Sequence, residues 1–180
     1  MLTIQDMFQN QSKIDEGVLV EVSDQLWKLG SLQEIKEKVS EDLFVVHVGI
    51  NMIGNWKNDG WWCLICEQAY LVPYIPDVLK IFGLEEMKTV FESIISLFPE
   101  YTTFSNEDES YYDIVNFLQN AHFKVNDERL NHISIEKRKA MVRLIHQRIA
   151  RLEDITDPLW GYGSQNDGWK SALDFIALKI

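Results

Sequence analysis

The amino-acid sequence predicts a single all-α domain over residues 1–180, built as an irregular bundle of about eight to ten helices. Apolar residues recur at spacings of three and four along most of the chain, as they do on one face of an α-helix. The chain has only 4 Pro and 9 Gly, so no long linker is expected. One β-branched run occurs, at residues 44–50, and no second run could pair with it.

The first part of the chain predicts three amphipathic helices, over residues 2–11, 18–29 and 32–39. Gly30 follows the second of these and is a typical helix stop. Residues 41–55 are ambiguous, because the run at 44–50 could form a buried strand. Apolar residues also recur there at helical spacing, and the missing partner strand favours a buried helix.

Asn58-Asp59-Gly60 predicts a turn, because Asn and Asp bond their own backbone and Gly adopts positive φ at little cost. Trp61 then begins a buried helix that is expected to reach Tyr70. The same four letters return at Asn166-Asp167-Gly168-Trp169, which we interpret as a second turn leading into a helix.

The middle of the chain has clear helix boundaries. Pro76 suits the first turn of a helix that ends at Phe82, with Gly83 as its cap. Residues 84–98 form the clearest amphipathic pattern in the sequence, and Pro99 ends it.

The C-terminal part predicts a loop over 100–109 that ends in a helix cap at Asn106, and a second loop over 154–163. Between and beyond them, helices are expected at 110–121, 134–152 and 168–180. The region 134–180 is basic. The cations of helix 134–152 could contact nucleic acid, but we expect them to pair with the acidic body, within the chain or across a dimer.

The net charge of −11 argues against autonomous binding to nucleic acid or an anionic membrane, because Lys and Arg supply such affinity. Residues 1–128 carry 8 Lys and Arg against 22 Asp and Glu, whereas residues 129–180 carry 9 against 6. An acidic body therefore precedes a mildly basic tail, and a basic protein is the expected partner. Without a signal peptide or an apolar run of membrane length, a cytoplasmic location is expected.

Cys63 and Cys66 form the one motif with possible covalent chemistry. A Cys-x-x-Cys pair at a helix start can be redox-active, because the helix dipole lowers the pKa of the first thiol. The strand that normally precedes such a motif is missing, and Leu64 and Ile65 between the cysteines favour a packed pair. A thiol oxidoreductase therefore stays as an alternative function.

No catalytic or metal-binding constellation is present. The four histidines show no spacing that would complete a zinc site with the cysteines, and neither a nucleophile elbow nor a phosphate-binding loop occurs. We expect no metal, no cofactor and no enzymatic activity.

Six carboxylates near helix starts are candidates for contact with a partner. They can serve as helix caps or solvated charges, and they can also imitate the phosphate spacing of DNA. They are Glu85, Glu86, Glu107, Asp108, Glu109 and Asp113.

A longer pattern begins at Asn58 and ends at Pro99. It has a turn at Asn58, Gly60 and Trp61, an aromatic helix, a stop at residues 81–84 and a helix that ends in Leu-Phe-Pro at 97–99. This order resembles the core of a bacterial DNA-mimic protein family, which is largely described as a domain of unknown function.

The resemblance covers about 42 of the 180 residues. Asp59 stands where the family has a second-position Gly, and Trp61 stands where it has Phe. The resemblance implies an all-helical fold and, for the characterised type of member, an acidic homodimer that imitates DNA and sequesters a helix-turn-helix repressor.

We therefore expect a non-enzymatic interaction module that binds a basic DNA-binding regulator, with an immunity-type protein that neutralises a basic toxin as the alternative from another class.

Overall fold

The computed structural model describes residues 1–180 and confirms the all-α class, with nine α-helices, three short 3-10 segments and no strand. The α-helices are α1 (Ile4–Phe8), α2 (Glu16–Trp27), α3 (Leu32–Lys38), α4 (Glu41–Glu67), α5 (Ile75–Ile81), α6 (Glu85–Ile95), α7 (Glu109–Gln119), α8 (Ile135–Trp160) and α9 (Lys170–Ala177). The 3-10 segments are Ala69–Tyr74, Glu128–Leu130 and Gln165–Gly168.

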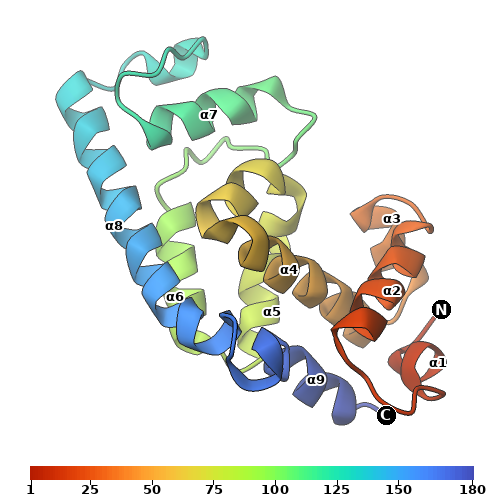
Figure 1. Cartoon of the computed structure of the whole chain (residues 1–180). Helices are drawn as coiled ribbons and strands as arrows, with labels where there is room; N and C mark the ends of the chain where they lie inside the picture. The colour runs from red at the N-terminus through yellow and green to blue at the C-terminus, as the bar shows by residue number, and fades with distance from the viewer.

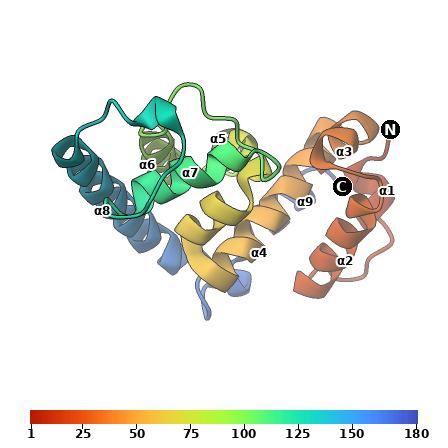
Figure 2. The same ribbon diagram turned by 90° about the horizontal axis from the view of Figure 1, so that it is seen from above.

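Helix α4 runs through the centre of the molecule (Figure 1). It contacts α2, α3, α5, α8 and α9. Helices α1 to α3 lie at one end of α4, and α6, α7 and α8 gather at the other (Figures 1 and 2). The long helix α8 packs along α6 and α7. A single core of 42 buried residues connects the two ends.

The ambiguous residues 44–50 are helical, and every one of them is buried. A helix surrounded by other helices needs no polar face, so its sequence loses the alternation between apolar and polar residues. The β-branched residues at 45, 46, 48 and 50 therefore reflect burial on all sides of α4.

Several predicted boundaries are confirmed. Helix α3 begins at Leu32 as predicted, with Ser31 in a capping box with Glu34, and Pro76 lies in the first turn of α5. Helix α6 ends at Ile95, earlier than the predicted Phe98. The backbone N–H groups of Leu97 and Phe98 bond to carbonyls three residues back, so the chain leaves the α-helix in a tighter turn.

The predicted loop over 154–163 is wrong, because α8 continues to Trp160. Thr156 and Trp160 are buried there, and this packing holds the final turns in helical form although Pro158 removes one backbone donor. The predicted cap at Asn106 is also wrong. Asp108 caps α7 instead, and the Asn106 side chain donates to the carbonyl of Glu67 at 2.9 Å.

Both ends of the chain lie at the same end of the molecule (Figure 1). Leu2 forms two backbone hydrogen bonds with residues 38 and 40, and Lys179 forms an ion pair with Asp42 at 2.9 Å. None of the helices combines the length and the apolar character needed to cross a bilayer.

Candidate functional site

The predicted turn at Asn58-Asp59-Gly60 is reduced to a break at a single residue. Asn58 and Asp59 remain helical within α4, and Gly60 leaves the helix with φ 76° and ψ 179°. The helix restarts at Trp61, whose backbone N–H donates to the Glu153 carboxylate of α8 at 2.6 Å. A carboxylate at this position caps the new helix start and complements its dipole.

The tryptophans around the break are held by the same part of α8. The Trp56 indole donates to the second Glu153 oxygen at 2.6 Å, and the Trp61 indole donates to Thr156 at 2.8 Å. Trp61 is fully buried and packs against Trp160, with ring centroids 5.5 Å apart. Trp56 and Trp61 thus form a structural joint between α4 and α8 on either side of Gly60.

The second Asn-Asp-Gly-Trp motif has a different backbone. Asn166 and Asp167 adopt left-handed conformations, whereas Asn58 and Asp59 are helical. Both motifs place a glycine of positive φ directly before a buried tryptophan, and Trp169 is 2% exposed. The interpretation as a turn into a helix is confirmed for the second motif, whereas the first motif is a break at Gly60 within α4.

Cys63 and Cys66 lie in the restarted part of α4 and form no disulfide. Burial raises the pKa of Cys63 to about 11, with a further contribution from Glu67, and raises the pKa of Cys66 to about 12. A redox-active pair requires a lowered pKa, because the thiolate is the nucleophile. These environments therefore favour inert thiols.

The six candidate acids do not form one cluster. On α6, Glu85 forms an ion pair with Lys88 at 3.9 Å, and Glu86 pairs with Arg151 of α8. These two carboxylates therefore have cations beside them within the fold.

The remaining four candidates lie on or before α7. Asp108 caps the helix, and hydrogen bonds from the Ser110 side chain and backbone lower the pKa of its carboxyl group. Asp113 accepts the backbone N–H of Asn126 at 3.2 Å. Glu107 and Glu109 are exposed, and their carboxylates form neither an ion pair nor a hydrogen bond.

A polar network lies between α2 and α4. The Ser23 hydroxyl is 3.2 Å from Nδ1 of His47, and the Asn51 amide donates to Ser23 at 2.9 Å. Burial lowers the pKa of His47 to about 4. Ser23 is itself only 5% exposed, and the Nε2 atom of His47 has no partner to orient the imidazole from its far side, so this pair lacks the arrangement of a nucleophilic triad. No group of three or more possible metal ligands occurs.

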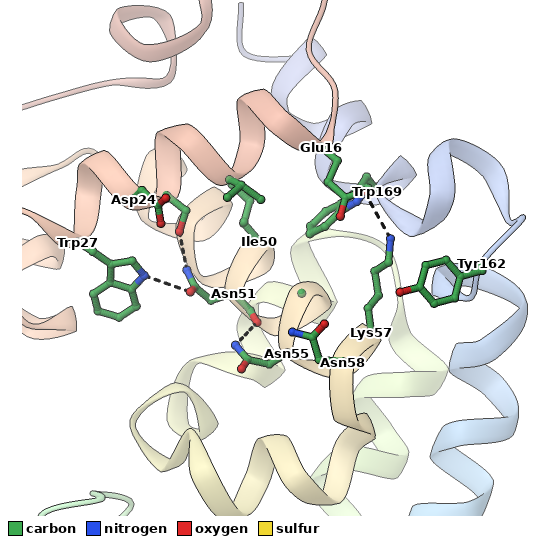
Figure 3. Close-up of a pocket in the computed structure, with 13 residues that line it drawn as sticks. Glu16, Asp24, Trp27, Ile50, Asn51, Asn55, Lys57, Asn58, Tyr162 and Trp169 are labelled. Atoms are coloured by element: carbon green, nitrogen blue, oxygen red, sulfur yellow. Dashed lines mark hydrogen bonds and ion pairs between the residues drawn. The ribbon is translucent and has the colours of Figure 1, made fainter.

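This network forms one wall of a cleft of about 250 Å³ between α2, α4 and residues 162–169 (Figure 3). The lining combines amide, carboxylate and aromatic side chains. It includes Glu16, Ser23, Asp24, Trp27, Asn51, Asn55, Lys57, Asn58, Tyr162 and Trp169.

Lys57 closes one end of the cleft (Figure 3). Its side chain is 6% exposed, and its ammonium group donates to the Asp167 carbonyl at 2.6 Å and lies 3.8 Å from the Glu16 carboxylate. The same ammonium group lies 5.2 Å from the ring centroids of Tyr162 and Trp169. Lys57 thus links α4 to both α2 and the 162–169 segment.

Sequence reasoning missed this cleft. The signal that could have found it is the recurrence of Asn51, Asn55 and Asn58 along the most apolar helix of the chain. Spacings of four and three place these amides on one face of α4. A polar stripe on a buried helix indicates that the stripe lies against polar partners or an opening.

No protein-family model, no curated protein and no solved structure matches this chain.

Proposed function

We propose that this protein is a non-enzymatic acidic module that binds the basic surface of a DNA-binding regulator by presenting carboxylates in place of phosphates. The observation that carries the proposal is the distribution of ion pairs. Only eight of the 28 carboxylates take part in ion pairs within the chain. The fold therefore leaves most of its carboxylates without a cation partner.

The cations of α8 also support a basic partner. Arg138 donates to backbone carbonyls at the end of α7, Arg148 donates to the Ser93 carbonyl, and Arg151 pairs with Glu86. Because these side chains are bound within the fold, the basic helix offers less positive surface than its sequence suggests. This arrangement favours a basic partner over nucleic acid.

We define the acidic face as Glu67, Glu107 and Glu109, three exposed carboxylates at the meeting point of α4 and α7. The bond between Asn106 and the Glu67 carbonyl brings the two segments together. Tyr112, 49% exposed, lies on the first turn of α7 and adds an aromatic group of the kind enriched at interfaces. Carboxylates that face a basic groove accelerate association and make it depend on salt.

The test measures binding to a panel of purified basic helix-turn-helix proteins by calorimetry at about 50 and 200 mM salt. We expect at least one member to bind, Kd to rise roughly tenfold or more over this salt range, and operator DNA to compete. Salt-independent binding, or no binding across the panel, would contradict the proposal. A basic toxin domain in the same panel tests the immunity-type alternative.

Two matched triple variants locate the binding face. Glu67→Gln with Glu107→Gln and Glu109→Gln neutralises the acidic face, and Glu85→Gln with Glu86→Gln and Glu92→Gln neutralises carboxylates that are already paired on α6. Both remove three negative charges. We expect the first to weaken binding by tenfold or more and the second by much less, whereas equal losses would place the interaction elsewhere.

A further inference from the structure

The cleft between α2 and α4 has the size of a site for one side chain. Its volume of about 250 Å³ lies below the roughly 300–1,000 Å³ of pockets that hold drug-sized ligands. Asp24 and Trp27 line it from α2, and Asn55 and Asn58 line it from α4 (Figure 3). What could enter this cleft depends on which of its polar atoms are still free.

Most hydrogen-bond donors on the α2 side of the cleft are already used within the chain, whereas the Asn58 amide and the Trp169 indole N–H have no partner. The Trp27 indole donates to Asn51 at 3.2 Å, the Asn51 amide donates to Ser23, and the Asn55 amide donates to the Asn51 carbonyl at 2.7 Å. The ammonium group of Lys57 is directed to the Asp167 carbonyl and to Glu16. The cleft therefore retains few donors for a ligand.

Several acceptors beside them, by contrast, remain free. The Asp24 carboxylate and the side-chain oxygen of Asn55 form no hydrogen bond or ion pair, and neither does the Asn58 amide. Tyr162 is 85% exposed and offers an aromatic surface at the opposite end. A ligand that complements these groups must supply donors and positive charge, since a phosphate or carboxylate would meet Asp24 without a free cation.

We infer that the cleft receives the guanidinium group of an arginine side chain from the basic partner, and this inference rests on the proposed function. A guanidinium group supplies five donors in a planar fork, which suits the carboxylate of Asp24 together with amide oxygens. It also stacks on aromatic rings such as that of Trp27, which lies three residues after Asp24 on α2. The acidic face would then attract the partner, and the cleft would select an arginine on it.

The test uses isotope-labelled protein titrated with N-acetyl-arginine methylamide and, separately, with the matching citrulline compound. Citrulline has nearly the same shape without the charge. We expect arginine to shift the side-chain signals of Asn55, Asn58 and the Trp27 indole with a millimolar Kd, and citrulline to shift them at least tenfold more weakly. Equal binding of the two compounds, or no shift at tens of millimolar, would overturn the inference.

Asp24→Asn should raise the Kd of the arginine compound by tenfold or more, because it removes the free carboxylate. The matched control is Asp154→Asn, an exposed residue of α8 that forms no side-chain bond and lies outside the cleft. Neither substitution breaks a contact of the fold, so melting temperatures should stay close to that of the parent. Equal losses in both variants would show a general charge effect and contradict a site in the cleft.

The outcomes separate this inference from the proposed function. If a basic protein binds with salt sensitivity but Asp24→Asn leaves its Kd unchanged, the cleft is not the arginine site and the proposed function stands. If the arginine compound binds in the cleft and no basic protein of the panel binds, the acidic-module proposal fails and a partner's arginine is excluded as the occupant.

Discussion

Folding lowers the pKa of His47. It is fully buried, Trp27 packs edge-on against its ring at 4.7 Å, and its Nε2 atom has no partner. Burial disfavours the imidazolium form and lowers the pKa from 6.5 to about 4. The His47 ring is therefore neutral in the folded state over most of the physiological pH range.

The first prediction follows from this shift. Because the unfolded chain binds a proton below pH 6.5 and the folded chain does so only near pH 4, stability present above pH 6.5 is lost as pH falls toward 4. Between pH 7 and pH 5 we expect a loss of about 2 kcal/mol in the free energy of unfolding from this group. Urea denaturation of parent and His47→Phe should show this part of the pH dependence disappearing in the variant.

The control is the same substitution at His146, an exposed residue of α8. Because His47 is still present, that variant should keep the pH dependence of the parent. An unchanged slope in His47→Phe would mean that carboxylates alone account for acid destabilisation.

The second prediction concerns the backbone of Gly60. Its φ of 76° disfavours any side chain, and an added Cβ would lie 2.8 Å from the Glu153 carboxylate that caps Trp61. Gly60→Ala should therefore lower the free energy of unfolding by about 1–3 kcal/mol. Gly54→Ala is a matched control in the same helix, where the nearest atom is 3.8 Å away, and it should be neutral or stabilising by up to about 1 kcal/mol.

At the scale of elements, the contact between α7 and α8 depends on one side chain. The guanidinium group of Arg138 donates to the carbonyls of Phe117, Asn120 and Phe123 at 2.8 to 3.0 Å. These carbonyls belong to the end of α7 and the turn after it, where no helical donor remains. Arg138 thus acts as a C-terminal cap supplied by another helix, which its place in a basic helix did not indicate.

Arg138→Lys should show that the planar fork is needed. An ammonium group cannot reach all of these carbonyls in the same geometry, so we expect a loss of about 1–3 kcal/mol in the free energy of unfolding. Hydrogen exchange should locate the loss at the end of α7. Arg143→Lys on the same helix is exposed and unbonded, and it should change stability by less than about 0.5 kcal/mol. Equal effects of the two substitutions would contradict the capping role.

Most helices could be predicted from periodicity and stop signals, because α2, α3, α5 and α6 each present one apolar face. The end of α8 could not be predicted in this way. Pro158 and the acids of residues 153–157 are typical of a loop, and only the long-range packing of Thr156 and Trp160 makes them helical. The cleft was missed for a related reason, since its walls come from α2, α4 and residues 162–169, and no local pattern brings these together.

At the scale of the whole molecule, the net charge of −11 should itself oppose folding. Since few of its carboxylates are paired, repulsion among them exceeds the attraction of the surface ion pairs. Raising NaCl from about 20 mM to 500 mM shortens the Debye length and should stabilise the fold by about 1 kcal/mol, a rise in melting temperature of roughly 2–4 °C. Calorimetry measures this, and a fall in melting temperature would show that ion pairs dominate.

The acidic character of the surface could thus be read from composition, but the positions of the available carboxylates could not. Glu85 and Glu86 looked as exposed as Glu107 and Glu109 in the sequence. Only the folded chain brings Lys88 and Arg151 to the first pair and leaves the second pair free.

The joint at Gly60 has a consequence for the chain as it is synthesised. Trp56 and Trp61 bond to Glu153 and Thr156, which lie 92 to 97 residues further along, and the Asp167 partner of Lys57 lies 110 residues away. A ribosome that adds roughly 5–20 residues per second needs on the order of 5–20 s to supply these partners. Until then the nascent chain lacks the contacts that α8 makes with the tryptophans of α4, so newly made protein should depend on chaperones more than the finished fold does.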